Sequence, residues 1–111
     1  MEITTSSFKH CDLLKIKGRI DSATAPQFEQ AIQALTDQSR FRIILDLKEL
    51  EFMSSAGLRE LVIMQKNCRR YNRGELVLAE VPDVIKSALE LSGFTQLFKF
   101  FDDPLSAVGN F

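Results

Sequence analysis

The run Phe41-Arg42-Ile43-Ile44-Leu45-Asp46-Leu47 is nearly continuous in apolar, strand-forming residues. A strand of this composition is covered on both faces, as in a parallel sheet that lies between helices. Upstream, Ile3–Phe8 is expected to be extended, and Leu14–Lys17 alternates apolar and charged residues like a strand with one face in water. Downstream, strands are expected at Glu75–Ala79 and Leu97–Phe100. Helical segments separate these strands, so the order predicts an α/β fold with a largely parallel sheet.

Two longer helices flank the central run. The first starts at Thr24, which we expect to cap its first turn while Gln27 reaches back three residues. Its apolar face is formed by Phe28, Ala31, Ile32 and Leu35. A short loop follows the central strand, and the second helix then runs from Ser54-Ser55 to about Tyr71. Asn72-Arg73-Gly74 is expected to end it.

A third helix begins at Val81-Pro82-Asp83 and ends before Gly93. Its apolar positions are Val84, Ile85, Ala88, Leu89 and Leu91. A last short helix is expected from Pro104 to Val108.

Length and composition fit one globular domain. The chain has 111 residues, 45% hydrophobic and 26% charged, so residues 1–111 are expected to form a single domain with a stable core. The balance of 14 basic and 15 acidic residues argues against a dedicated nucleic-acid-binding protein. No apolar run approaches the roughly 20 residues that cross a bilayer, so no direct membrane insertion is expected. The start, Met1-Glu2-Ile3-Thr4, does not resemble a secretory signal, and we expect a cytoplasmic location.

Several kinds of chemistry are not supported. Cys11 and Cys68 form no CxxC pair, and both thiols are expected to be reduced. These cysteines and the single histidine, His10, make no zinc site, and no phosphate-binding loop or GxGxxG motif is present, so we expect no metal and no cofactor. A hydrolase nucleophile elbow is not expected either. It needs a glycine two residues before the serine, where Met53 stands before Ser55, and it needs a histidine base.

Two aspartates follow predicted strands. A phosphate-accepting receiver domain would need Asp46 to be joined by further carboxylates and a lysine, but Asp21 stands alone after an early strand. We instead expect Asp46, helped by Asp21, to brace the loop that carries Ser54 and Ser55 by accepting hydrogen bonds from loop N–H groups.

Ser54 and Ser55 open the longest helix, directly after the most buried strand and its loop. A serine at this position can cap the helix by accepting a backbone hydrogen bond, which is worth about 1 kcal/mol. The same position favours a phosphate, because free N–H groups and the helix dipole stabilise negative charge. From the position of the serines alone, each could therefore be either a helix cap or a phosphorylation site.

The same helix has two distinct faces at about 100° per residue. Its apolar side, made of Leu58, Leu61, Val62 and Cys68, is expected to face the sheet. A narrow basic stripe holds Ser55, Arg59, Lys66, Arg70 and Arg73, with Arg69 at its edge and Ile63 close by. This stripe is either a solvated helix face or a docking surface for an acidic partner.

Three motifs together resemble the STAS domain family, named for sulfate transporters and anti-sigma factor antagonists. They are Gly18-Arg19-Ile20-Asp21, Ile44-Leu45-Asp46-Leu47, and Phe52-Met53-Ser54-Ser55-Ala56-Gly57-Leu58. The later segments Val81-Pro82-Asp83-Val84-Ile85, Leu91-Ser92-Gly93-Phe94 and Phe98-Lys99-Phe100 are similar to that family's third helix and last strand. The resemblance covers about Ile3 to Val108 and implies a mixed, mostly parallel sheet with helices packed against it.

The resemblance also implies a function, that of a stand-alone anti-sigma factor antagonist acting by partner switching. The unphosphorylated antagonist would bind an anti-sigma factor that is also a serine kinase, and a PP2C-type phosphatase would reverse the kinase reaction. By alignment on Gly57 and Leu58, the accepting serine corresponds to Ser55. Ser54 is the second choice, because this chain has a second serine where many members carry aspartate. Asp21, Asp46 and Gly57 would support this site, and Arg59, Ile63, Lys66 and Arg70 would contact the partner.

Two other functions remain open at this point. The same surface could hold a partner constitutively, as a scaffold or as a subunit module of a transporter or a signalling assembly. An enzyme or nucleotide-binding protein could instead use the polar residues Asp21, Asp46 and Ser55.

Overall fold

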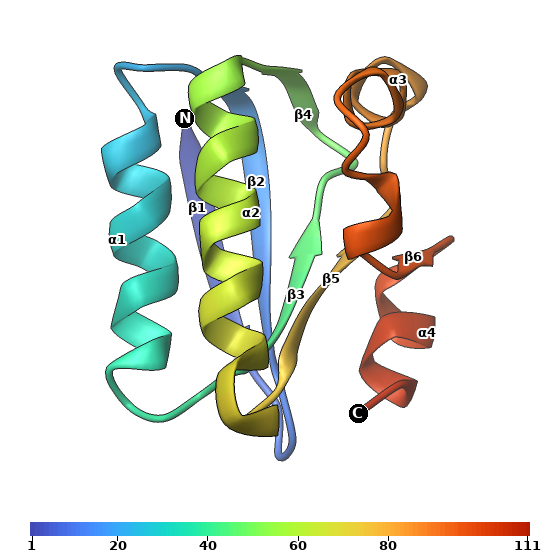
Figure 1. Cartoon of the computed structure of the whole chain (residues 1–111). Coiled ribbons are helices and arrows are strands. Elements are labelled where there is room, and N and C mark those ends of the chain that lie inside the picture. The colour runs from blue at the N-terminus through green and yellow to red at the C-terminus, as the bar shows by residue number, and fades with distance from the viewer.

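The computed structural model describes all residues from Met1 to Phe111 and contains one six-stranded sheet with helices on both faces (Figure 1). The strands are β1 (Glu2–Ser7), β2 (Asp12–Ile20), β3 (Arg42–Asp46), β4 (Leu50–Met53), β5 (Glu75–Ala79) and β6 (Phe100–Phe101). The helices are α1 (Ala25–Thr36), α2 (Ser55–Arg69), α3 (Asp83–Leu91) and α4 (Pro104–Gly109), with short 3-10 turns η1 (Arg70–Asn72) and η2 (Thr95–Leu97).

The sheet is mixed and mostly parallel, which confirms the predicted fold class. Its strand order is β1-β2-β3-β5-β6, and β4 pairs with β2 outside this path. The pair β1 and β2 is antiparallel, whereas β2 with β3, β2 with β4, β3 with β5, and β5 with β6 are parallel. Parallel neighbours need crossover connections, and α1, α2 and α3 supply them.

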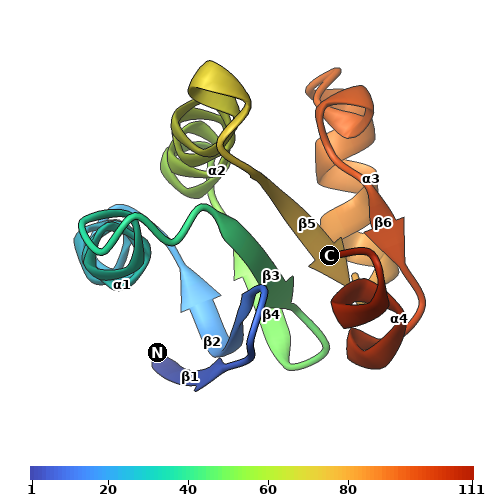
Figure 2. The same cartoon turned by 90° about the horizontal axis from the view of Figure 1, so that it is seen from below.

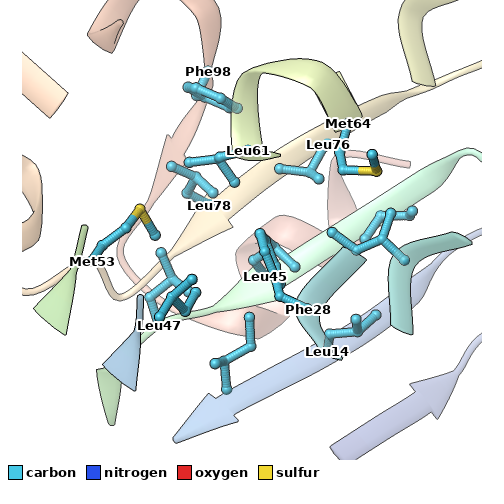
Figure 3. Close-up of a cluster of buried hydrophobic side chains, with 14 of the residues drawn as sticks. Leu14, Phe28, Leu45, Leu47, Met53, Leu61, Met64, Leu76, Leu78 and Phe98 are labelled. Atoms are coloured by element: carbon cyan, nitrogen blue, oxygen red, sulfur yellow. The ribbon is translucent and has the colours of Figure 1, made fainter. Parts of the chain in front are cut away.

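Two apolar clusters hold the layers together. The helices α1, α2 and α3 lie over one face of the sheet and α4 lies over the other (Figure 2). The larger cluster contains 20 buried residues between the sheet and α1, α2 and α3, among them Phe28, Leu45 and Leu61 (Figure 3). The smaller one lies on the other face of the sheet and consists of Cys11, Ile44, Val77, Ala79 and Ala107, the last from α4. Since β3 is covered on both sides, its apolar run is continuous rather than alternating.

The two cysteines belong to different clusters on opposite faces of the sheet. Cys11 is in the cluster that includes Ala107 of α4, and Cys68 is on the buried side of α2. Both are free thiols, and both are buried. Burial raises the pKa of the Cys68 thiol to about 11, and burial is also the main cause that raises the pKa of Cys11.

The segment before the serines, predicted as a loop, contains strand β4. The nine-residue β2 extends beyond β3, because β3 pairs only with Asp12–Lys15. β4 takes over from there and pairs with Gly18–Ile20 across an irregularity in register. In β4 only the first and last residues, Leu50 and Met53, are buried, so the four residues show no alternation that the sequence could reveal.

The C-terminal third also differs from the prediction. The expected strand Leu97–Phe100 is replaced by η2 and by the two-residue β6 at Phe100–Phe101. In α3, Ile85 and Leu89 are buried as expected, but Val84 is 64% and Leu91 90% exposed. Only one narrow side of this short helix reaches the sheet, so apolar residues outside it stay in water.

No sequence pattern indicates the role of Gln65, a buried side chain of α2 that completes the edge of β5. β6 is too short to pair with Leu76, although the Leu78 N–H two residues later donates to Lys99 O at 3.0 Å. Gln65 takes its place: its Oε1 accepts from the Leu76 N–H at 2.7 Å, and its Nε2 donates to Leu76 O at 2.9 Å. Nε2 also donates to Leu97 O at 2.7 Å, so one amide joins α2, β5 and η2.

We expect Gln65→Leu to lower the free energy of unfolding by at least about 2 kcal/mol, because buried backbone groups of Leu76 and Leu97 lose their partners. Urea denaturation measures this change. The matched control is Gln30→Leu on the exposed side of α1, which should stay within about 0.5 kcal/mol of the wild type. Equal unfolding midpoints for the two variants would contradict the structural role of Gln65.

Candidate functional site

The paired serines lie where the carboxyl ends of β2 and β4 meet the start of α2 (Figure 1). The Ser54 N–H donates a hydrogen bond of 2.8 Å to Ile20 O, the last residue of β2. The register pairs Ile20 with Met53, so β4 delivers the serines to the end of β2. In open α/β sheets this edge is where ligands and partners meet the protein.

The two serines have different environments. Ser54 is the N-cap of α2, with extended backbone angles, and its hydroxyl accepts a hydrogen bond of 3.3 Å from the Gly57 N–H. Ser55 is the first residue of α2, is exposed, and its hydroxyl makes no hydrogen bond within the protein. The cap and the available hydroxyl therefore belong to two neighbouring residues.

Gly57 lets the start of α2 approach the sheet closely. A Cβ atom at this position would lie 2.7 Å from Ile20 Cγ2 and 2.9 Å from Met53 Cγ, both in buried side chains. No side chain fits there without moving the core. The glycine thus supports the site by setting the distance between α2 and the ends of β2 and β4.

Asp21 organises the turn that follows β2, next to the serines. Its Oδ1 accepts hydrogen bonds from the N–H groups of Ala23 at 3.0 Å and Thr24 at 3.1 Å. Thr24 does not cap α1 through its side chain as predicted, because its Oγ1 accepts from the Asp21 N–H at 2.9 Å and donates to Arg19 O at 2.9 Å. The hydrogen bond from the Thr24 N–H is the main cause that lowers the pKa of Asp21.

Asp46 braces the start of the loop that leads to the serines, as expected, but it forms no hydrogen bond with either serine. Its Oδ1 accepts a hydrogen bond of 3.1 Å from the Lys48 N–H, in the turn that leads from β3 to β4. Strand register separates Asp46 from the serines. Asp46 pairs with Lys15 in the middle of β2, whereas Ser54 follows Met53, which pairs with Ile20 at the end of β2. The two aspartates thus follow neighbouring strands, as expected, but they lie at different levels of β2.

One side of α2 presents basic side chains to solvent. Arg59, Lys66 and Arg70 are exposed and take part in no ion pair of the structure, and Ile63 between them is 45% exposed. We call these four residues the α2 face. At about 100° per residue, Ser55, Arg59, Ile63 and Lys66 fall within a quarter of the helix circumference, opposite the buried side.

The predicted stripe is shorter in the structure. Arg69 lies 3.7 Å from Glu75, and Arg73 stacks on the Phe41 ring at 3.9 Å, so neither joins the α2 face. α2 itself ends at Arg69, because Tyr71 and Asn72 adopt left-handed backbone angles. Arg70 is exposed in the turn beyond the helix. On the buried side, Met64 and Gln65 join the predicted residues, while Val62 is only partly buried.

A like-charge contact lies beside this surface, between α1 and α2. Burial, and next the charge of Glu29, raise the pKa of Glu60, while Arg59 acts in the opposite direction.

Comparison with known proteins identifies the family. The family model described as Mlab, STAS domain matches residues 3–99 of the chain. The protein belongs to the STAS domain family. The match includes the strands β2 and β3, β4 with the serines, and the whole of α2, so it covers the site described above.

Three similar proteins bear names that refer to the same role. A protein of Bordetella bronchiseptica named "Putative anti-sigma factor antagonist BtrV" is 35% identical over 98 residues, which is 88% of this chain and 84% of that protein. The crystal structure of an anti-sigma factor antagonist from Mycobacterium paratuberculosis superposes with a TM-score of 0.86 at 22% identity, covering 98% of this chain and 92% of that one. The Bacillus protein SpoIIAA has been solved unphosphorylated and phosphorylated, with TM-scores of 0.83 and 0.77 at 14% identity and coverage of 98% of this chain. Those structures include 95% and 98% of their own chains in the match.

None of the helices of this STAS domain combines the length and the hydrophobicity that a bilayer span requires.

We expect Ser54→Ala to destabilise the domain by about 1 kcal/mol, because the Gly57 N–H loses its capping acceptor. Ser55→Ala is the matched control and should stay within about 0.5 kcal/mol of the wild type, since its hydroxyl has no partner to lose. Thermal and urea unfolding measure both. The reverse order of stabilities would contradict the assignment of cap and free hydroxyl.

Gly57→Ala should lower the free energy of unfolding by about 1–3 kcal/mol, because the added methyl group overpacks the contact with Ile20 and Met53. Elsewhere in a helix the same change usually stabilises, by up to about 1 kcal/mol. Gly109→Ala in α4 is the control, since a Cβ there meets nothing within 4 Å. A Gly57→Ala variant as stable as the wild type would overturn the close-contact role.

Proposed function

We propose that this STAS domain is an anti-sigma factor antagonist that acts by partner switching. In its unphosphorylated form it binds an anti-sigma factor that is also a serine kinase, and phosphorylation of Ser55 releases it. A PP2C-type phosphatase restores the binding form, and the cycle takes place in the cytoplasm. The observation that carries the proposal is the free, exposed Ser55 hydroxyl beside a capped Ser54 at the start of α2.

The position of Ser55 suits a reversible phosphate. The hydroxyl is accessible to a kinase without unfolding, because no hydrogen bond holds it. A phosphate there would lie at the amino end of α2, where free N–H groups and the helix dipole stabilise negative charge. Arg59, one turn along the helix, could pair with it. The domain would therefore keep its fold while its surface changes charge.

The α2 face gives the partner something to recognise. Three exposed cations surround the half-exposed Ile63, and such a combination suits a partner surface with an apolar pocket and an acidic rim. A dianion on Ser55 would stand next to the acidic groups of that rim, and like charges at a desolvated contact cost binding energy. Release upon phosphorylation follows from this repulsion.

The relatives support the same role. The protein from Bordetella bronchiseptica and the solved neighbours carry the name anti-sigma factor antagonist, and SpoIIAA exists in an unphosphorylated and a phosphorylated form. Such proteins act by binding, so we propose that this chain is a regulatory binding domain, with residues 1–111 as one unit. An enzyme or nucleotide site built from Asp21, Asp46 and Ser55 finds no support. Asp46, in β3, pairs with Lys15 of β2, whereas Asp21 and Ser55 lie at the far end of β2 beyond Ile20.

The test begins with phosphosite mapping by mass spectrometry on protein purified from its native cells, with and without phosphatase treatment. We expect phosphate on Ser55 alone. Phosphate on Ser54 would move the acceptor to the capping residue. Complete absence of phosphate under all growth conditions would favour the constitutive scaffold.

The second step measures binding to the serine kinase that phosphorylates this chain. Ser55→Ala should bind it like the unphosphorylated wild type, and Ser55→Asp should bind at least about tenfold more weakly. The control Ser87→Asp adds the same charge at an exposed position of α3 and should bind normally. Equal affinities of Ser55→Asp and Ser87→Asp would refute the switch.

A further inference from the structure

A basic hollow lies at the end of the molecule opposite Ser55. It has a volume of about 280 Å³ and is lined by Lys9, His10, Asp12, Arg40, Arg42 and Arg73, among others. β2 starts in this hollow at Asp12 and ends at Ile20, which contacts Ser54. Nine strand residues span about 25 Å, so the hollow and the phosphorylation site are separate surfaces.

Positive charge is in excess in the hollow. Four cationic side chains, Lys9, Arg40, Arg42 and Arg73, face one carboxylate, that of Asp12. The chain as a whole has a net charge of −1, so this excess is local. Lys9 and Arg42 are exposed and form no ion pair. Both are available to a ligand.

Arg40 is fixed in place on the wall of the hollow. Its Nε donates to Asp12 Oδ2 at 2.6 Å, and its second guanidinium nitrogen donates to Phe8 O at 2.8 Å and Cys11 O at 3.2 Å. The hydrogen bond to Asp12 is the main cause that raises the pKa of Arg40. This guanidinium is therefore charged and held rigidly.

Arg73 is fixed as well, but by neutral groups. It stacks on the Phe41 ring at 3.9 Å and donates to Asn67 O at 2.6 Å and Asn67 Oδ1 at 3.0 Å. Its Nε donates to Arg70 O at 3.0 Å. Since no carboxylate neutralises it, its positive charge stays available to an anion, and little side-chain entropy is lost when the anion binds.

Asp12 has a carboxylate oxygen that the protein itself leaves unpaired. The residue is only 1% exposed, and while Oδ2 pairs with Arg40, Oδ1 is buried without any hydrogen-bond partner. Buried carboxylate oxygens are normally paired, because an unpaired one is costly. A donor from outside the protein, such as a hydroxyl group, would complete this wall.

We propose that the basic hollow binds a phosphate group, either inorganic phosphate or the phosphate of a small hydroxyl-bearing monoester. Fixed guanidinium groups match phosphate oxygens in geometry and charge, and the volume suits a small ligand. Lys9 and Arg42 would add two exposed cations to the site, and a hydroxyl group of an ester would donate to Asp12. The site would work independently of Ser55.

The test is a titration of the whole chain followed by NMR amide shifts, with inorganic phosphate, glucose 6-phosphate and glucose as probes and sodium chloride at matched ionic strength as reference. We expect saturable shifts in Lys9–Asp12 and Ser39–Arg42 with both phosphates and none with glucose. Tighter binding of glucose 6-phosphate would identify an ester as the ligand, and equal binding would identify phosphate itself.

The double variant Lys9→Ala, Arg42→Ala should weaken phosphate binding by about tenfold or more. The control Lys17→Ala, Lys48→Ala removes the same charge at exposed positions outside the hollow and should bind like the wild type. All four positions are exposed, so circular dichroism should show unchanged folding. Shifts no larger than those in chloride, or equal affinities for the two double variants, would overturn the proposal.

Discussion

The nine-residue strand β2 is the constraint on which the rest of the structure depends, because it serves two parallel partners in succession. Its first half pairs with β3 and builds the central sheet, and its last residues pair with β4. The hydrogen bond from the Ser54 N–H to Ile20 O then fixes the start of α2 at the end of β2. This second pairing places the serines at the end of β2, next to Asp21, and away from Asp46, which pairs with Lys15.

Close contacts on α2 turn this placement into a rigid surface. Gly57 seats the start of the helix against Ile20 and Met53, and Gln65 ties its middle to β5 through three hydrogen bonds. Because the buried side is held at both points, the α2 face on the opposite side has a fixed orientation. In the proposed cycle, a partner can respond to a single phosphate at Ser55, since the helix backbone that carries this residue does not need to be ordered on binding.

Much of the fold and part of the site could be predicted from the sequence. The apolar run of β3 and the alternation of elements predicted the mostly parallel sheet, and helical periodicity separated the buried side of α2 from Arg59, Ile63 and Lys66. β4 could not be predicted, because the burial of its four residues does not alternate as it does in most strands. The role of Gln65 could not be predicted, because a glutamine on a helix is usually exposed to solvent. Its burial is explained only by the Leu76 backbone groups, which have no strand partner and pair with its amide. Arg73 does not belong to the predicted stripe, because its guanidinium stacks on the ring of Phe41, a residue distant in the sequence.

The sequence by itself determined the α/β class, the helix that opens at the two serines, and the family resemblance that the comparison confirmed, because these depend on local periodicity and on the order of short motifs. The tertiary structure alone decided which serine caps the helix and which is free, which aspartate stands beside them, and that cations from three separate segments line one hollow together with Asp12. These features depend on strand register and on contacts between distant residues, and neither follows from local sequence.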